Sequence, residues 1–270
     1  MKGPHAIMSL MLESLIQVVK SVAHSEIMPR YLKVAHDRKN DGSLFTQADL
    51  AAQEALVAAL SKIHDCPILG EEMSEARQKA LWQDNHDGVW CVDPIDGTSN
   101  FVHGIPYFAV SVALMKGGRP VLGVVYDPVA EEAFYAEKGS GAWLNGVQLP
   151  IISSNPDFAE AIAAVDLKRL PEKLALALGH RPPYASQRNF GASTLEWCYV
   201  AAGRFNLYLH GGQKLWDYAA GSLILEEAGG RCSTLEHDDF WAAPPWKRSV
   251  IAGLSPALFY EWRAWLREHL

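Results

Sequence analysis

The chain has 270 residues, of which 49% are hydrophobic and 20% are charged, and its formal net charge is −7. This composition is that of a globular protein with one large domain, or two smaller domains that share a core. The acidity argues against nucleic acid as the main partner, and no stretch approaches the roughly 18 apolar residues of a membrane span. Glu13 and Gln17 interrupt the apolar residues near the N-terminus, unlike a signal peptide. We therefore expect a cytoplasmic protein.

The first part of the chain predicts two helices joined by a loop. Apolar residues recur at helical spacing over 8–35. Residues 36–45 are polar and rich in turn formers, which predicts an exposed loop. Thr46 then begins a second helix, with Asp49 three positions later in the manner of a capping box.

The middle and the end of the chain predict sheets with helices layered against them. Short β-rich runs between Gly, Pro and Asp turns predict an antiparallel sheet, and they cover 66–72, 88–93, 106–118, 119–128, 131–139 and 141–149. Later strands are predicted at 161–167, 204–212 and 249–253, and helices at 172–179, 193–203, 216–230 and from Pro256 onward. Two sub-domains, 1–150 and 151–270, are the simplest division.

The four cysteines lie far apart and form no C-x-x-C pair. Each of them adjoins apolar residues, which predicts buried free thiols in a reducing compartment, and neither disulfides nor a zinc site. These cysteines are Cys66, Cys91, Cys198 and Cys232.

Acidic residues stand at four places where a strand or loop meets a helix. They are Asp49, the pair Glu71–Glu72, the pair Asp93 and Asp96, and Asp217. Carboxylates are hard oxygen ligands that suit Mg²⁺ or Mn²⁺. Taken singly, Asp49 and Asp217 are better explained as helix-start residues, and Glu71–Glu72 as an exposed acidic turn.

The stretch VDPIDGTSNF, residues 92–101, has no such structural explanation. Pro94 and Ile95 form a tight turn that aims Asp93, Asp96 and the Ile95 carbonyl at one point. Gly97 lets the backbone approach a ligand closely, and Thr98 begins a helix, whose free N–H groups suit a phosphate. Carboxylates for metal beside an anion-binding helix start predict metal-assisted phosphoryl chemistry.

Three motifs together resemble the inositol monophosphatase family, within the lithium-sensitive, Mg²⁺-dependent phosphatase superfamily. They are GEE at 70–72, DPIDGTSNF at 93–101 and WDYAAGSLILEEAGG at 216–230. The resemblance runs over nearly the whole chain and implies an α+β or α/β fold, a layered α-β-α-β-α sandwich of the inositol monophosphatase and fructose-1,6-bisphosphatase type, assembled as a homodimer. It also implies two or three Mg²⁺ ions, with Mn²⁺ as a substitute and Li⁺ or Ca²⁺ as inhibitors.

The resemblance assigns roles to individual residues. It implies one metal on Glu71, Asp93 and the Ile95 carbonyl, a second on Asp93, Asp96 and Asp217, and a third near Glu71. Thr98 and Asp49 resemble the hydrogen-bonded pair that, with Glu71, orients and deprotonates the attacking water. Backbone N–H groups of Gly97 and Thr98 would bind phosphate.

The substrate end matches the family less well. Gly191 and Ser193 stand near family substrate-contact positions, but His210 occupies the place, seven residues before Asp217, of a glutamate that binds inositol hydroxyls. A small polyol or sugar monophosphate, above all inositol 1-phosphate, is the expected substrate. The alternatives are a 3′-phosphoadenosine 5′-phosphate, histidinol-phosphate or fructose-1,6-bisphosphate phosphatase, the last with Arg188 or Lys214 at a second phosphate, or a regulatory binding protein. The full set of acids favours catalysis.

Overall fold

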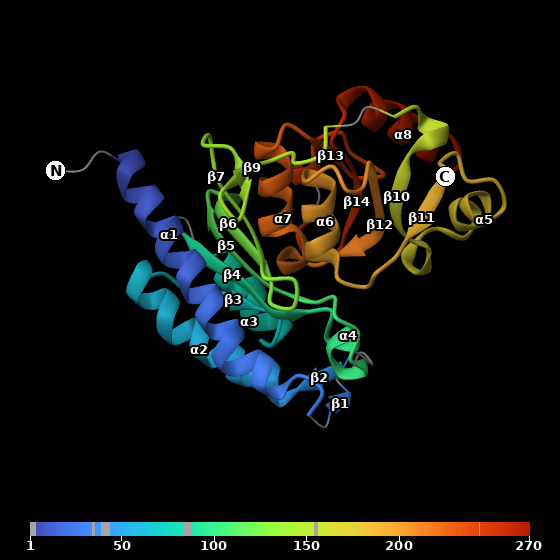
Figure 1. Ribbon diagram of the computed structural model, residues 1–270. Coiled ribbons are helices and arrows are strands. Elements are labelled where there is room, and N and C mark those ends of the chain that lie inside the picture. The colour runs from blue at the N-terminus through green and yellow to red at the C-terminus, as the bar shows by residue number, and fades with distance from the viewer. Residues whose placement is uncertain (1–3, 34–35, 39–43, 84–87, 154–155, 243) are drawn as a thin grey trace.

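The computed structural model describes residues 4–33, 36–38, 44–83, 88–153, 156–242 and 244–270. Its elements form five layers, as the predicted sandwich requires (Figure 1). The first layer holds α1 (Pro4–Val22) and α2 (Gln47–Ile63), and a seven-stranded sheet follows. The central layer holds α6 (Ser193–Ala201) and α7 (Leu215–Glu227). A five-stranded sheet and an outer layer with α5 (Glu172–His180) and α8 (Pro256–Glu268) complete the sandwich.

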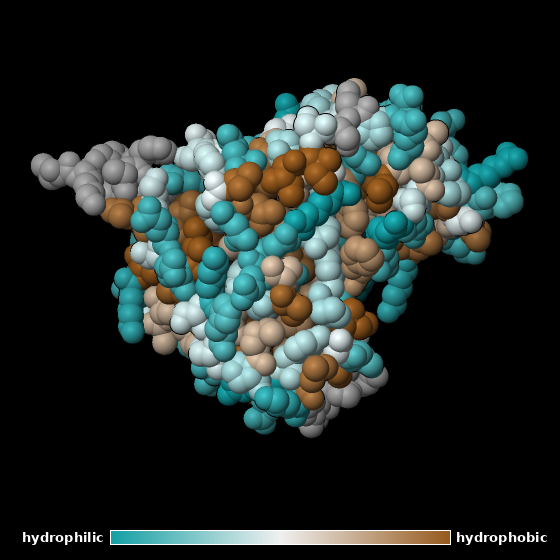
Figure 2. All heavy atoms as spheres, viewed as in Figure 1, coloured by the Kyte–Doolittle hydropathy of each residue, from teal (hydrophilic) through white to brown (hydrophobic). Residues whose placement is uncertain are grey.

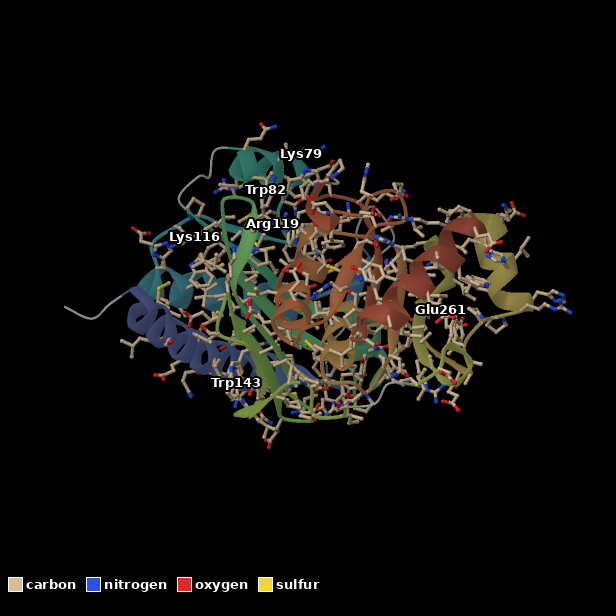
Figure 3. All side chains as sticks on the ribbon, turned by 90° about the horizontal axis from the view of Figure 1, so that it is seen from above. Lys79, Trp82, Lys116, Arg119, Trp143 and Glu261 are labelled. Carbon is tan, nitrogen blue, oxygen red and sulfur yellow. The ribbon has the colours of Figure 1, made fainter. Side chains whose placement is uncertain are left out.

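Three apolar clusters hold these layers together. The first lies between α1, α2 and one face of the seven-stranded sheet. The second fills the space around α6 and α7 and touches both sheets, and the third lies between the five-stranded sheet and α5 and α8. Seen from above in Figure 3, Glu261 of α8 lies on the opposite side of the molecule from α1. The central cluster is shared by both sheets, so it does not separate residues 1–150 from residues 151–270. The division into two sub-domains stays a prediction.

The seven-stranded sheet follows the order of the chain from β3 to β9. Its strands are β3 (Ile68–Gly70), β4 (Val89–Asp96), β5 (Ala109–Lys116), β6 (Arg119–Asp127), β7 (Glu132–Glu137), β8 (Ala142–Leu144) and β9 (Val147–Gln148). Neighbours are antiparallel from β4 onward, but β3 pairs parallel with β4. The expectation of a wholly antiparallel sheet is therefore wrong at this edge, because α3 (Glu75–Gln83) carries the chain back between the two strands.

The five-stranded sheet is mixed and has the order β11-β10-β12-β14-β13. Its strands are β10 (Ile162–Asp166), β11 (Ser186–Arg188), β12 (Leu207–Gln213), β13 (Arg231–Ser233) and β14 (Arg248–Gly253). Strand β10 is parallel to β11 and β12, whereas β14 is antiparallel to both of its neighbours. Short 3₁₀ turns lie at Phe158–Glu160, Leu167–Arg169 and Phe240–Ala242.

The N-terminal helix and the loop after it differ from their predicted form. The helix begins at Pro4, continues through a π-helical turn at Ala23–Ile27 and ends in a 3₁₀ turn at Met28–Arg30, where Pro29 cannot donate a backbone hydrogen bond. Instead of a plain loop, the next segment contains β1 (His36–Arg38) and β2 (Leu44–Thr46), which pair antiparallel. Residues 39–43 of the expected loop lie outside the described residues.

Two glycines allow the central helices to pack closely. A Cβ atom at Gly123 of β6 would lie 3.1 Å from Cα of Ala220 on α7, and one at Gly221 of α7 would lie 2.5 Å from Cβ of Trp197 on α6. Any side chain at these two positions would push α7 away from its neighbours. Helix α7 is thereby held close against the face of the seven-stranded sheet.

The four cysteines differ in how deeply they are buried. All four cysteines are free, but only Cys91 and Cys198 are buried, so the predicted burial is wrong for Cys66 and Cys232. On the face shown in Figure 2, hydrophobic residues form several patches among hydrophilic ones. Among the described residues, no helix combines the length and the apolar character that crossing a membrane requires.

Candidate active site

A bulge in β4 brings Asp93 and Asp96 to the same face of the sheet. Side chains alternate along a strand, so two residues three positions apart would normally face opposite sides. Asp93 pairs with Ser111 and Asp96 with Ala109, so three steps along β4 match only two along β5. The extra residue restores the parity. Both aspartates therefore face the layer of α6 and α7.

Hydrogen bonds fix each of the two aspartates. Asp93 Oδ1 accepts from the Ile95 amide at 3.1 Å, inside the turn itself. Asp96 Oδ2 accepts from the backbone and the hydroxyl of Thr194 at 2.6 and 2.7 Å, in the first turn of α6. A carboxylate at a helix N-terminus is stabilised by the free N–H groups and by the helix dipole. Ser193 Oγ lies 3.5 Å from the other Asp96 oxygen.

Glu71 and Asp217 reach the same region from two other elements. Glu71 follows β3, and its amide still bonds to the Val92 carbonyl of β4 at 3.3 Å. It therefore stands beside Asp93, at the carboxyl ends of two parallel strands. Gln78 of α3 donates to the Gly70 carbonyl at 2.9 Å and holds this turn. Asp217 is the third residue of α7 and accepts from the Lys214 amide at 2.8 Å.

The acids raise one another's pKa values. Burial raises the pKa of Asp93 well above its usual value, and the charges of Glu71, Asp96, Asp217 and Asp49 add to the effect. Burial also raises the pKa of Asp96 to about 6, against the hydrogen bonds from Thr194. The pKa of Asp217 is raised well above its usual value by burial and then by the charge of Asp96. This is the electrostatic pattern of a cluster of like charges that favours a cation.

A cavity of about 690 Å³ opens over these acids, between the carboxyl ends of strands in both sheets. One wall carries Glu71, Asp96 and Asp217, and Asp93 lies buried behind it at 1% exposure. Gly191, Ser193 and His210 line the same cavity. Three of the predicted acids and the three predicted substrate residues thus line one cavity, although they come from six different elements or turns.

The N-terminal turn of α4 (Thr98–His103) carries the predicted phosphate and water-orienting residues. Gly97 precedes the helix with φ of 88°, and a Cβ atom there would lie 3.1 Å from the Tyr107 carbonyl, so glycine is required twice over. The Thr98 hydroxyl donates to the Ile95 carbonyl at 3.0 Å. Asp49 instead accepts from the amide and hydroxyl of Thr46 at 2.8 and 2.6 Å, as the predicted capping box requires. The implied Thr98–Asp49 hydrogen bond is therefore not the one that Thr98 makes, since its single proton is directed at Ile95.

The opposite wall of the cavity was not foreseen as a unit. Asp166 ends β10 and is the register partner of His210 on the parallel strand β12. His210 Nε2 lies 3.2 Å from Asp166 Oδ2, and the Gly212 amide donates to Nδ1 at 3.1 Å. An amide can only donate, so Nδ1 must be the acceptor and the proton sits on Nε2, which donates to Asp166. Arg169 Nη1 binds the same Asp166 oxygen at 2.6 Å.

The charges of this second wall are matched. Burial alone would raise the pKa of Asp166, but the hydrogen bond from His210, the Lys168 amide and the charge of Arg169 together lower it. His210 is therefore oriented by its neighbours and is not a freely rotating substrate ligand. The sequence offered one signal for this wall, since Asp166 is an acid at the end of an apolar strand.

Glu196 is a second unforeseen acid of the cavity. It lies on α6 at 3% exposure and accepts from the Phe190 amide at 3.0 Å. Burial raises its pKa to about 7, and the charge of Asp96 adds to the effect of burial. Because it holds residue 190 beside Gly191, Glu196 shapes the part of the cavity that the sequence predicted as substrate-binding.

The donor set fits a hard divalent cation. Glu71 after β3, Asp96 of β4 and Asp217 of α7 line one cavity, and carboxylate oxygens of this kind are hard ligands that suit Mg²⁺. Within the described ranges, no three His, Cys, Asp or Glu side chains converge closely enough to form a ready-made cage. Carboxylates that repel one another across a cleft match an ion such as Mg²⁺, which retains several waters among its ligands.

Comparison with known proteins agrees with this site. The family model described as the inositol monophosphatase family matches residues 8–267, so the chain belongs to that family. It is 37% identical over 198 residues to the Nus factor SuhB of Pasteurella multocida, covering 71% of this chain and 72% of that protein. It is 33% identical over 242 residues to the inositol-1-monophosphatase of Mesorhizobium japonicum, covering 86% of each chain.

Solved structures share the fold along the whole chain. The extragenic suppressor protein SuhB of Bartonella henselae is 30% identical, with a TM-score of 0.83 over 96% of this chain and 98% of that one. The IMPase of Thermotoga maritima is also 30% identical, with a TM-score of 0.80 over 95% and 98%. The layered sandwich that the motifs implied is therefore confirmed.

Proposed function

We propose that the protein hydrolyses phosphate monoesters of small polyols or sugars with the help of Mg²⁺, and that inositol 1-phosphate is its leading substrate. The observation that carries this proposal is the acidic wall: Glu71, Asp96 and Asp217 line a cavity of about 690 Å³, and Asp93 lies buried behind them. Such a wall repels a phosphate ester on its own, so a cation is needed between them.

The roles that the family resemblance implies suit this geometry. The metal ligands would be Glu71, Asp93, Asp96, Asp217 and the Ile95 carbonyl. Bound Mg²⁺ supplies a Lewis acid and lowers the pKa of bound water. Glu71 would accept the proton of the attacking water.

The phosphate itself would lie at the start of α4. There the Gly97 and Thr98 amides would bind the phosphate oxygens, and Asp49 and Thr98 would help to orient the water. The Thr98 hydroxyl would have to turn from the Ile95 carbonyl to take part.

The rest of the substrate would lie between Gly191, Ser193 and His210. The names of several relatives support an inositol phosphate, since the curated inositol-1-monophosphatases are 33–34% identical to this chain. At the position where the family resemblance implies a glutamate that binds inositol hydroxyls, this chain has His210, which pairs with Asp166. A homodimer and a cytoplasmic location stay predictions.

A second candidate is a regulatory binding role, which the relatives named Nus factor SuhB support at 36–37% identity. The regulatory role does not require the acidic wall, so it does not exclude catalysis by the same protein. A protein that has kept this wall only for binding would be folded and would bind Mg²⁺, yet would turn over no phosphate ester.

Phosphate release from a panel of esters tests the proposal. The panel is inositol 1-phosphate, 2′-AMP, β-glycerophosphate, histidinol phosphate and 3′-phosphoadenosine 5′-phosphate, each with and without Mg²⁺. We expect Mg²⁺-dependent turnover, which Asp93→Asn lowers by more than about 10³-fold, or ~4 kcal/mol. Asp157→Asn, at an exposed residue whose side chain caps no helix, is the matched control and leaves the rates unchanged. A folded, Mg²⁺-binding protein without turnover would favour the regulatory role.

A further inference from the structure

The segment between β11 and α6 reaches the cavity without forming a helix or a strand. Asn189 and Gly191 line the cavity, and residues 189–191 are all exposed. Gly191 has φ of 80°, a left-handed conformation that suits glycine. Backbone outside regular structure must find other partners for its N–H and C=O groups. The groups that bind this segment therefore decide where it meets a substrate.

Both backbone groups of Phe190 are bound by buried side chains. Its amide donates to Glu196 Oε1 at 3.0 Å, and its carbonyl accepts from Asn100 Nδ2 at 2.6 Å. Glu196 is 3% exposed and Asn100 is 7% exposed. We call these two side chains the clamp of segment 189–191. Because a shift of the segment would leave a buried acceptor and a buried donor unpaired, the clamp fixes its position.

Asn100 ties the segment to helix α4, where the phosphate is expected. Its Nδ2 also donates to the Tyr107 carbonyl at 2.7 Å, so the side chain is itself held in place. A Cβ atom at Gly191 would lie 3.5 Å from the Asn100 amide, which shows how closely the segment lies on it. Asn100 belongs to the motif DPIDGTSNF, but the motif alone assigned it no role. The contacts give it one, because they set the distance between the segment and α4.

Glu196 ties the segment to α6 and to β12. The Tyr208 hydroxyl donates to Glu196 and accepts from Gln213 Nε2 at 2.5 Å. Gln213 Oε1 in turn accepts from Trp197 Nε1 at 3.0 Å. Tyr208, Gln213 and Trp197 are all buried. A network whose members are all bonded is rigid, so it fixes Glu196 relative to the strand that carries His210.

We propose that Asn100 and Glu196 are positioning residues, which hold segment 189–191 against the alcohol part of a substrate whose phosphate lies at the start of α4. This inference rests on the proposed function and deepens it, because it names residues that set the choice between esters. The acidic wall acts on every phosphate ester alike. The clamp acts on those esters whose alcohol carries hydroxyl groups that the segment can bind.

A pair of esters with different alcohols tests the clamp. We would measure kcat and KM with Mg²⁺ for inositol 1-phosphate and for p-nitrophenyl phosphate, whose leaving group carries no further hydroxyl. The wild-type protein should prefer inositol 1-phosphate. Glu196→Leu keeps the approximate size but offers no acceptor, and it should lower this preference about tenfold, through KM, as loss of a well-placed hydrogen bond predicts. Glu196→Gln keeps an acceptor oxygen for the Phe190 amide and should restore the preference.

Asp127 provides the matched control. Its buried carboxylate accepts from the Val129 and Ala130 amides at 2.8 and 2.9 Å, and it is not among the residues that line the cavity. Asp127→Leu should lower the thermal midpoint about as much as Glu196→Leu does and leave the preference unchanged. The same loss of preference in both variants would overturn the clamp, since reduced stability would then explain it. If Glu196→Leu does not fold, Glu196→Ala replaces it with the same expected loss.

The clamp and the proposed function fail in different ways. Hydrolysis of both esters with the same preference in the wild-type protein and in Glu196→Leu would overturn the clamp and leave the phosphatase standing. If neither ester is hydrolysed, the proposed function is wrong, and calorimetric titration with inositol 1-phosphate in the presence of Ca²⁺ decides on the clamp. Binding that is about tenfold weaker in Glu196→Leu and restored in Glu196→Gln would support it. Equal affinity in all variants, or no binding, would overturn it.

Discussion

The two walls of the cavity solve the problem of buried charge in opposite ways. On the wall formed at β3, β4 and α7, burial and the charges of neighbouring acids raise the pKa values of Asp93, Asp96 and Asp217. On the wall of β10 and β12, Asp166 binds His210 and Arg169, and its pKa is lowered. The first wall is complete only with a cation from solution, whereas the second carries its cation within the chain.

This difference separates two tasks. A wall of unmatched acids stores repulsion that a metal ion relieves, so it is suited to binding that ion and to the reaction that the ion assists. A wall of matched charges adds no net field, and it holds a shape instead. In that wall His210 has one tautomer and one orientation.

The largest expected effect concerns Gly211 of β12, which packs against the Arg169 backbone in the wall of matched charges. A Cβ atom at Gly211 would lie 1.9 Å from the Arg169 carbonyl oxygen, and neither backbone can move without breaking the wall. Gly211→Ala should lower the free energy of unfolding by about 3 kcal/mol, near the upper end for overpacking. Gly212→Ala is the matched control, since its Cβ meets only the flexible Lys247 side chain at 3.3 Å, and it should cost less than about 1 kcal/mol. Urea unfolding measures both, and equal losses would contradict this account of the packing at Gly211.

The second prediction concerns the acidic wall, where a substitution should raise the free energy of unfolding instead of lowering it. With EDTA present at pH 7, Asp93→Asn removes a buried like charge and keeps an oxygen for the Ile95 amide. Because burial raises the pKa of Asp93 well above its usual value, the variant should unfold with a free energy higher by more than the ~1.4 kcal/mol of one pKa unit. Mg²⁺ should then stabilise the wild-type protein and not the variant. Destabilisation by Asp93→Asn in EDTA would mean that the acidic wall is not strained.

The sequence predicted the acidic wall of the site but not the wall of matched charges. The acidic wall rests on short motifs, because Asp93, Ile95, Asp96 and Gly97 are almost contiguous and their turn residues leave few conformations open. The matched wall rests on tertiary register. Asp166 meets His210 only because β10 and β12 run parallel, 44 residues apart in sequence, and no local pattern contains that information.

The same contrast holds for the fold: elements with a local sequence pattern were predicted, and an element without one was missed. Helical periodicity predicted α1, because its buried face carries regularly spaced apolar residues, and the capping box of Thr46 and Asp49 predicted the start of α2. Helix α3 has the sequence EARQKALWQ, whose only buried residue is Gln78, so it has no apolar stripe to recognise. The direction of β3 was wrong as a consequence, because without α3 the return of the chain between β3 and β4 is invisible.

The smallest expected effect tests the sign of the second wall through its pH dependence. The pKa of Asp166 is lowered in the folded protein, so its charge stabilises the fold fully above the unfolded value of about 3.9 and loses this effect as pH falls through the folded value. Asp166→Asn keeps the oxygen that accepts from the Lys168 amide but loses the charge facing His210 and the half-exposed Arg169. We expect it to lower the free energy of unfolding by about 1 kcal/mol. Urea unfolding should give the same difference at pH 7 and pH 5, and the difference should close only below about pH 4. A difference that instead grows as the pH falls would mean that Asp166 is strained, as the acids of the opposite wall are.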